Sequence, residues 1–493
     1  MYYQKTNQIM RKTVISFIFV LMTINLWGYD FKIDKIYYNF NSDSISVSVA
    51  PWPGSGEYTG KIVIPPKIIY NEKEYIVTEI DTNAFWDCMY VTSIIIPETV
   101  TKIGAGAFTW CYGMDSITLP ETITEIEDSL FYGCHALKSF TIPKTVTRIG
   151  EEAFECCCNL TSIEIPKNVT EIGDRVFSRC SNLREIYISS NITKIGISPF
   201  VDCSRLENIV VSEINPYYSS EDGILYNKSQ SKLIQYPCGK SWKEYNVSNK
   251  VKIIGESAFM HCDSLRNITI PDNVEVIEDN AFKYCENLES ITIPESVNTI
   301  EKSAFSSCKN VKSITCIGEI PATLSQNAFE MVNKDIPLYV PKDAINQYKN
   351  SFLWNAFRNI IGCYSVDTSG ENGVVKGGGF LPADSTIIIS AIPNEGYVFS
   401  SWSDDNTENP REIKLTQNMD LKAIFESSLT TEVELPQVTP IKIYMNGDQL
   451  VVDGIDDYTI YTLNGQNLGK CKHLVTGVYI IVANNKSFRI IIK

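Results

Sequence analysis

The chain has 493 residues, more than one compact hydrophobic core usually organises, so several domains or a repeat array with accessory domains is expected. A hydrophobic content of 44% excludes wholesale disorder. The 43 basic and 58 acidic residues give a formal net charge of −15, and this surplus of carboxylates argues against binding to nucleic acid or to anionic lipid surfaces.

Residues 1 to 28 have the pattern of a secretory signal peptide. Arg11 and Lys12 precede an apolar run from Val14 to Trp27, which is short and lies at the terminus. A single-pass N-terminal anchor stays open as the alternative, because the cleavage region lacks a clean small-x-small pattern. No other uncharged run approaches membrane length, so we expect no transmembrane helix in the mature chain.

Residues 29 to 61 are predicted to form an N-terminal β cap. Ile45, Val47 and Val49 alternate with polar residues as in a strand, and a cluster of prolines and glycines follows. A repeat array exposes its first unit to water, so a hairpin at this position would cover that end.

A 23-residue repeat then dominates the sequence. Its mark is a phenylalanine followed three residues later by a cysteine, from Phe85 and Cys88 to Phe305 and Cys308, with an interruption in the middle. Such fixed self-similarity is typical of stacked units that cannot bury their apolar side alone. We interpret these residues as a buried structural spine, which includes Phe108, Cys111, Phe131, Cys134, Phe154, Cys157, Phe177 and Cys180.

Each repeat also contains a short alternating segment, such as S-I-T-L-P at Ser116 to Pro120. The period of two predicts a strand with Ile117 and Leu119 inward and Thr118 outward, and the proline ends it. Repeating that strand every 23 residues predicts a mainly β solenoid with a parallel sheet.

The full pattern L-x-x-I-x-I-P-x-x-V-x-x-I-G-x-x-A-F-x-x-C runs from Leu137 to Cys157 and from Leu265 to Cys285. It resembles the BspA-type leucine-rich repeat of bacterial and protist surface proteins. The resemblance implies a curved leucine-rich-repeat solenoid over residues 62–362, with a C-terminal cap at 317–362. The interruption at 212–250 is interpreted as a hairpin-like insertion with an Asp-Gly turn, projecting as an arm.

Two further segments follow the array. Residues 363–427, with Gly377 to Gly379 and Trp402, resemble the small all-β B-repeat of internalin-type surface proteins. Residues 428–440 are interpreted as a linker. Residues 441–493 read as a small β domain, and their Y-x-x-N-G-Q, G-V-Y and terminal I-x-K elements resemble the sorting tail of type IX (Por) secretion cargo. That resemblance implies recognition by the outer-membrane machinery, removal of the tail and often a lipopolysaccharide anchor.

Catalytic chemistry, cofactors and metal sites are not expected. The three histidines, His135, His261 and His473, do not share a repeat position, and no catalytic motif occurs. Cysteines on neighbouring repeats would have Cα atoms about 5 Å apart, which permits disulfides by distance. Parallel side chains rarely reach the disulfide torsion, so buried free thiols are the favoured interpretation, with disulfides as the alternative.

The outward strand position departs from threonine at Tyr187 and Val210 on consecutive repeats. With Tyr217, Tyr218 and Tyr226 of the insertion, these residues form our candidate binding patch. The alternative is that the hairpin folds back and buries these groups itself.

The sequence therefore predicts a secreted or outer-membrane surface-attached, non-enzymatic binding or adhesion protein. Its expected partners are host matrix or bacterial surface proteins or glycans, and the type IX secretion machinery through the tail. Two alternatives stay open: an exported hydrolase-associated subunit, and a structural surface-layer component.

Overall fold

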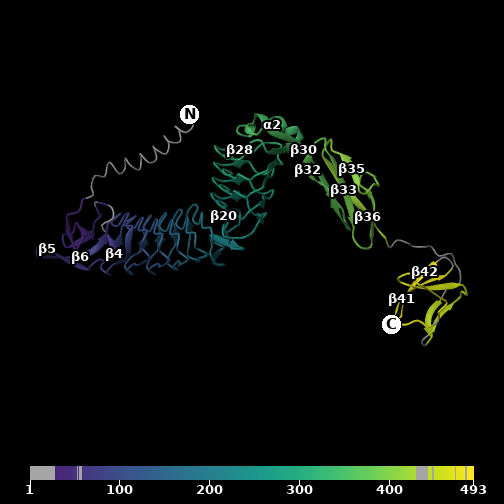
Figure 1. The fold of residues 1–493 in the computed structure, drawn as a ribbon, viewed down its shortest axis with the longest axis horizontal. Coiled ribbons are helices and arrows are strands. Elements are labelled where there is room, and N and C mark those ends of the chain that lie inside the picture. The colour runs from purple at the N-terminus through teal and green to yellow at the C-terminus, as the bar shows by residue number, and fades with distance from the viewer. Residues whose placement is uncertain are drawn as a thin grey trace. The chain divides into compact units, whose positions relative to one another are not determined.

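The computed structural model describes residues 28–52, 54, 58–428, 442–446, 449–471, 473–483 and 486–492. Strands dominate these residues, which confirms the predicted fold class of a mainly β solenoid (Figure 1). The chain divides into two compact units, and the first of them holds the whole repeat array. The predicted signal peptide lies outside the described residues except for Gly28, as does the predicted linker except for Ser428.

Each 23-residue repeat forms one rung, a three-sided coil whose first side is a short strand. These strands stack in parallel with their register one repeat apart, for example Thr141 beside Glu164. We call the surface that they form the sheet face. In the first stack of rungs its strands are β4 (Thr59–Val63), β7 (Tyr90–Ile95), β9 (Ser116–Thr118), β11 (Ser139–Thr141), β13 (Ser162–Glu164), β15 (Glu185–Ile188) and β17 (Asn208–Val211).

The second side of each rung is a two-residue strand whose isoleucine points into the core. Ile126 and Ile149 are neighbours in this parallel ladder, and both are fully buried. Its strands in the first stack are β8 (Lys102–Ile103), β10 (Glu125–Ile126), β12 (Arg148–Ile149), β14 (Glu171–Ile172) and β16 (Lys194–Ile195).

The third side carries the phenylalanines and cysteines of the spine, all of them buried. Rings of successive rungs stack, as Phe108 does on Phe131 with ring centroids 5.6 Å apart. Most spine thiols donate to the carbonyl oxygen of the phenylalanine one rung earlier, as Cys134 does to Phe108 at 3.2 Å. Cysteine suits this position because it is small and apolar and still supplies a weak donor to a buried carbonyl.

Two residues on this third side adopt left-handed backbone conformations in most rungs. They lie two positions before and two after the phenylalanine, as do Glu152 (φ 54°) and Cys156 (φ 61°) around Phe154. Such conformations cost about 1–2 kcal/mol for residues other than glycine. Backbone hydrogen bonds between rungs offset this cost, since Glu152 N donates to Asp174 O and Cys156 N donates to Ser178 O.

The N-terminal residues cover the first rung. Strands β1 (Phe31–Ile33), β2 (Ile36–Phe40) and β3 (Ser46–Val49) form an antiparallel sheet, and β3 pairs in parallel with β6 (Lys73–Ile80), which forms a hairpin with β5 (Lys67–Tyr70). The buried ring of Tyr58 packs 5.2 Å from that of Phe85. An aromatic side chain therefore covers the open end of the phenylalanine stack.

A junction interrupts the array after β17. It consists of β18 (Tyr218–Glu221), β19 (Ile224–Asn227) and β20 (Lys232–Gln235), joined as antiparallel strands. The turn between β18 and β19 has positive φ at Asp222 (51°) and Gly223 (75°), as a two-residue type I′ turn requires. The predicted hairpin is therefore present, but it does not project: Leu225 is buried in the core before the junction and Ile224 in the core after it.

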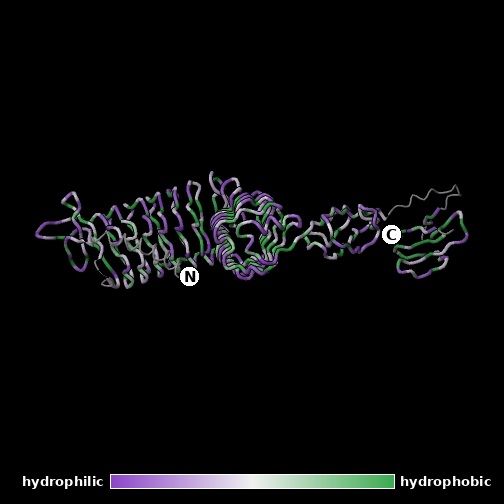
Figure 2. Tube along the Cα trace, turned by 90° about the horizontal axis from the view of Figure 1, so that it is seen from above, coloured by the Kyte–Doolittle hydropathy of each residue, from purple (hydrophilic) through white to green (hydrophobic). Residues whose placement is uncertain are grey.

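A second stack of rungs begins at the junction, where Tyr236 takes the place of a spine phenylalanine and packs on Phe259 at 5.0 Å. Figure 2 shows this stack along its axis while the first stack is seen from the side, so the stacking direction changes here. Its sheet-face strands are β21 (Glu244–Asn246), β23 (Asn267–Thr269), β25 (Ser290–Ile293), β27 (Ser313–Cys316) and β29 (Pro337–Pro341), and its second side has β22 (Ile253–Ile254), β24 (Val276–Ile277), β26 (Thr299–Ile300) and β28 (Thr323–Leu324).

Short helices cover the last rung. They are η1 (Lys342–Ala344), α2 (Ile345–Asn350) and η2 (Trp354–Ala356), at the place where the sequence predicts a terminal helix. The ring of Trp354 packs 5.4 Å from that of Phe329, and its indole N–H donates to Ala322 O at 2.8 Å. The second end of the array is thus also closed by an aromatic side chain.

Strand β30 (Asn359–Ser369) pairs with β29 and continues into the small domain that follows. That domain contains β31 (Gly373–Lys376), β32 (Gly379–Pro382), β33 (Thr386–Pro393), β34 (Tyr397–Trp402), β35 (Arg411–Lys414) and β36 (Met419–Ser427). Trp402 is fully buried, and its indole N–H donates to Glu408 O at 2.8 Å.

The C-terminal segment folds as a separate set of strands with Ile460 and Ile481 in its core. They are β37 (Lys442–Asn446), β38 (Gln449–Asp453), β39 (Tyr458–Thr462), β40 (Asn467–Gly469), β41 (Gly477–Ala483) and β42 (Lys486–Ile492). Across the described ranges, no helix is long and apolar enough to cross a membrane.

One disulfide corrects the prediction of free thiols along the spine. Cys262 is bonded to Cys238, whose Cα lies 4.6 Å away, because the junction places Cys238 directly against the first rung of the second stack. The other thirteen cysteines are free, and burial raises the pKa of the spine thiols, to about 12 for Cys88 and Cys308.

We predict that Phe154→Ala lowers the stability of the array by about 3–5 kcal/mol, because it removes a fully buried ring from the stack. Calorimetry of the full chain should show a clear fall in the melting temperature of the solenoid transition. Thr141→Ala on the exposed sheet face is the matched control and should leave that transition in place. An unchanged transition for Phe154→Ala would contradict the stacked spine.

We also predict that few thiols react in the native protein. Cys156, Cys158 and Cys471 are partly exposed, whereas the other ten free cysteines are buried. A chromogenic disulfide reagent should therefore modify at most three thiols per native chain and thirteen after unfolding without reductant. Cys156→Ser with Cys158→Ser should lower only the native count. Rapid native modification of ten or more thiols would contradict the burial.

Candidate functional site

The sheet face carries one outward column of residues that runs from rung to rung. The register places Ile95 beside Thr118, Thr141 beside Glu164, and Tyr187 beside Val210. In the second stack the same column reads Asn246, Thr269, Thr292, Thr315 and Tyr339. Threonine is the commonest residue of the column. Tyr187 and Val210 form an exposed apolar pair in its middle, and Val63 beside Ile95 forms another at its start.

The pair is exposed because its strands bury only their alternate residues. In β15 the isoleucines Ile186 and Ile188 are buried, which turns Tyr187 outward with 53% of its surface exposed. Val210 on β17 is 38% exposed. Parallel neighbours in a sheet lie about 4.8 Å apart, so the two side chains form one continuous apolar surface.

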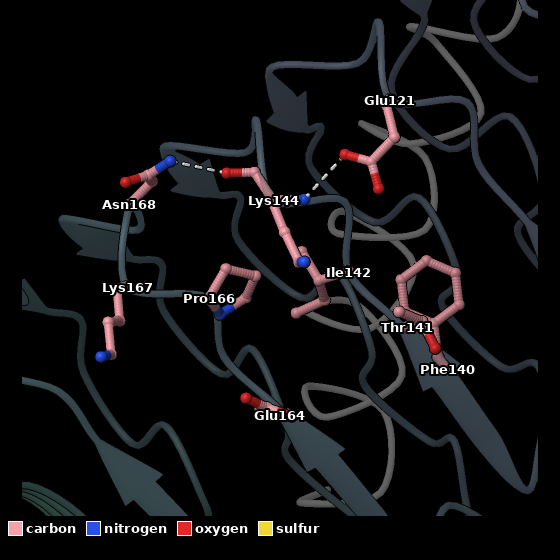
Figure 3. A pocket seen from close by; sticks show the side chains of 9 residues that line it. All are labelled: Glu121, Phe140, Thr141, Ile142, Lys144, Glu164, Pro166, Lys167 and Asn168. Carbon is pink, nitrogen blue, oxygen red and sulfur yellow. Dashed lines mark hydrogen bonds between the residues drawn. The ribbon is translucent and has the colours of Figure 1, made fainter.

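A depression of about 440 Å³ lies on the same face, at the strands β11 and β13 that precede β15 (Figure 3). Its floor includes Phe140 and Pro166, and its charged groups are Glu121, Lys144, Glu164 and Lys167. Figure 3 shows the Lys144 side chain over the depression and Glu164 approaching from β13.

Hydrogen bonds fix the loop that borders this depression. Lys144 N donates to Glu121 Oε2 at 3.1 Å, and Asn168 Nδ2 donates to Lys144 O at 2.7 Å (Figure 3). Since Glu164 is next to Tyr187 in the outward column, the depression and the apolar pair form one surface, which we call the sheet-face site.

The sheet-face site offers polar and apolar groups, and its lining contains no recognisable catalytic set. The residues that line the depression include carboxylates, amines, an amide and the Thr141 hydroxyl, without a histidine or cysteine among them. An apolar pair beside groups of both charges suits reversible recognition of a partially polar surface. Within the described part of the chain, no three His, Cys, Asp or Glu side chains converge as a metal site.

The three tyrosines of the insertion differ in exposure, and Tyr226 cannot contribute to this site. Tyr226 is only 2% exposed, and its hydroxyl lies 2.8 Å from that of Tyr245, so the structure overturns its proposed place at a binding surface. Tyr217 is exposed, but it lies on the loop that enters β18. Burial raises the pKa of both Tyr218 and Tyr226.

Tyr218 closes the end of the first ladder. Its hydroxyl accepts a hydrogen bond from the backbone N–H of Ile195 on β16, the last strand of that ladder, at 2.8 Å. The buried Asn215 also pairs open backbone groups. Its side-chain amide N–H donates to Ser189 O and Ile192 O. Its side-chain oxygen accepts from the backbone N–H groups of residues 217 and 218. The side chains of Asn215 and Tyr218 therefore satisfy backbone groups that the next rung would otherwise pair.

Sequence reasoning missed one exposed aromatic at the junction. Trp242 is partly exposed, stacks on Tyr245 at 6.0 Å, and lies under the Lys240 ammonium at 4.4 Å. Burial lowers the pKa of Lys240. The sequence contains this pair as Trp-x-x-Tyr in the insertion. Because the insertion lies outside the repeat pattern, the spacing does not predict whether these side chains point inward or outward.

Comparisons with known proteins agree with the repeat pattern. A family model described as a BspA type leucine rich repeat region matches residues 78–215 and 235–358, more than half of the chain. A second model, a divergent InlB B-repeat domain, matches residues 364–428 and confirms the resemblance of that segment. No curated protein matches the chain significantly.

Solved structures share the solenoid. A leucine rich cell surface protein from Faecalibacterium prausnitzii A2-165 matches with a TM-score of 0.53 and 25% identity, over 67% of this chain and 93% of that one. The pneumococcal vaccine antigen PcpA matches with a TM-score of 0.52 and 21% identity, over 67% of this chain and 98% of that one, which shows the fold. The repeat pattern, the solenoid and the family model lead to one conclusion: the chain belongs to the BspA-type leucine-rich repeat family.

Proposed function

We propose that this chain is a non-enzymatic binding protein of the cell surface or the extracellular space that recognises its partner through the sheet-face site. The observation that carries the proposal is the exposed apolar pair Tyr187 and Val210, which lies beside a depression with charges of both signs. Leucine-rich repeat proteins of this family are generally surface or secreted binding proteins, and the similar Faecalibacterium protein is a cell surface protein.

The partner that fits this site is a protein or glycan of a host matrix or of another bacterial surface. A partly exposed tyrosine offers both a flat apolar ring and a hydroxyl, which serves protein side chains and sugar rings alike. The neighbouring Lys144 and Glu164 supply a donor and an acceptor of opposite charge. Aromatic residues in the centre of such surfaces often contribute most of the binding energy.

We predict that Tyr187→Ala with Val210→Thr weakens binding of the full chain by about tenfold or more to whichever matrix protein, bacterial surface protein or glycan the parent binds on an array. The matched control is Thr292→Ala with Thr315→Ala, which changes the same column in the second stack. This control should bind as the parent does. Equal binding by parent and the Tyr187 variant, or a parent that binds nothing on the array, would contradict the proposal.

We also propose that residues 441–493 direct the protein through the type IX (Por) secretion machinery. Support comes from the Y-x-x-N-G-Q, G-V-Y and I-x-K elements, and from the separate core of this segment, which centres on Ile460 and Ile481. The signal peptide expected at residues 1–28 would bring the chain to the periplasm first.

Deletion of residues 441–493 should trap the protein in the periplasm of a host that has this secretion system, whereas the parent should reach the surface or the medium. Immunoblots of cell fractions measure the outcome. Deletion of 364–428, the B-repeat segment, is the control and should not trap the chain. Export of the tail-less chain in parental amounts would contradict the proposal.

A further inference from the structure

A second depression lies where the two stacks of rungs meet, away from the sheet-face site. It has a volume of about 450 Å³, and we call it the junction groove. One wall is the end of the last ladder strand of the first stack, with Ile195, and the residues after it, with Ile197. The junction supplies Tyr218, Lys232 and Ile234, and the opposite wall consists of second-stack residues from Gly255 to Glu301.

The floor of the groove is apolar at a place where many rungs have an acidic residue. Ile197 is 51% exposed and follows the glycine of its rung. The matching positions are acidic in five other rungs, with Ala105 and Lys302 among the exceptions; the acidic ones are Asp128, Glu151, Asp174, Glu256 and Asp279. An exposed isoleucine in this column, beside Ile195, Ile234 and the half-buried Tyr218, therefore creates an apolar strip.

The second-stack wall has more carboxylates than cations. The only amine in the described lining is Lys232, and both carboxylate oxygens of Glu278 lie 2.7 Å from its Nζ. The charge of Lys232 also lowers the pKa of Glu256 and of Glu301, but less than burial and the neighbouring carboxylates raise them. Glu256, Asp279 and Glu301 remain as a surplus of three carboxylates. Asp279 accepts a backbone hydrogen bond from Lys302, which leaves its charge uncompensated by any side chain in the groove.

These carboxylates repel one another across a partly buried space. Burial, followed by the charges of Asp279 and Glu278, raises the pKa of Glu256 and of Glu301. Asp174 of the first stack adds to the effect on Glu256 from across the groove. A cation placed between the walls would relieve this repulsion.

We propose that the junction groove binds a lysine-rich segment of a partner protein. The aliphatic stem of a lysine fits the strip formed by Ile195, Ile197 and Ile234, and its ammonium reaches the carboxylates of the opposite wall. A metal ion is a poorer occupant, because no three ligands converge among the described residues. Since the walls come from both stacks, an occupant would also hold the two stacks together.

The test uses the full chain and a fluorescent peptide of alternating lysine and alanine, with binding measured by anisotropy at low salt. We expect Glu256→Gln with Glu301→Gln to weaken binding by about tenfold or more, and Ile197→Ser to weaken it severalfold. Added salt should weaken parental binding. A peptide of alternating serine and alanine should not bind.

Two controls make the result specific. Glu319→Gln with Glu330→Gln removes the same charge from exposed positions of the second stack and should not change binding. Tyr187→Ala with Val210→Thr should bind the lysine peptide as the parent does, which separates this groove from the sheet-face site. Calorimetric transitions like the parent's show that the groove variants are folded.

Three outcomes would overturn the proposal: equal binding by the Glu256 and Glu301 variant, an equal loss in the Glu319 and Glu330 control, or equal affinity for the uncharged peptide. The second outcome would assign binding to the net charge of the chain instead of the groove.

Discussion

The structure depends on one constraint: a rung of this solenoid can bury its apolar interior only against another rung. Stacked phenylalanine rings and thiol-to-carbonyl hydrogen bonds repeat that contact along the array. Every place where the repetition stops therefore needs a substitute. Tyr58 covers the first ring and Trp354 the last, while in the middle Tyr236 starts the second series and Tyr218 pairs the last open backbone N–H of the first.

The sequence predicts whatever follows from position within the repeat. The spacing of Phe and Cys places the spine inside, and the same count turns Tyr187 and Val210 outward, because side chains of a strand alternate. The solenoid and the outward pair thus follow from residue spacing alone. The roles of Tyr218 and Tyr226 do not. Tyr218 pairs a backbone N–H that the broken ladder leaves open, and Tyr226 is buried against the Tyr245 hydroxyl of the junction.

The disulfide and the junction groove escape prediction for a related reason. Cys238 precedes Cys262 by 24 residues, one more than the repeat, so counting rungs does not bring the two together. The groove joins residues as distant as Ile197 and Glu301, and their proximity depends on how the junction redirects the stacking. Ile197 gives a local signal in the sequence, because many rungs have an acidic residue at its position.

The junction also limits how far local unfolding can spread along the solenoid. In a one-dimensional repeat array, local unfolding spreads from unit to unit because each unit is stabilised by an interface with an identical neighbour. Here Ile224 and Leu225, adjacent in the chain, face different cores, and the series of stacked rings ends at Phe200 before it resumes at Tyr236. We therefore expect unfolding that starts at a proteolytic cut or a locally unfolded rung of one stack to stop at the junction. The other stack would then stay folded.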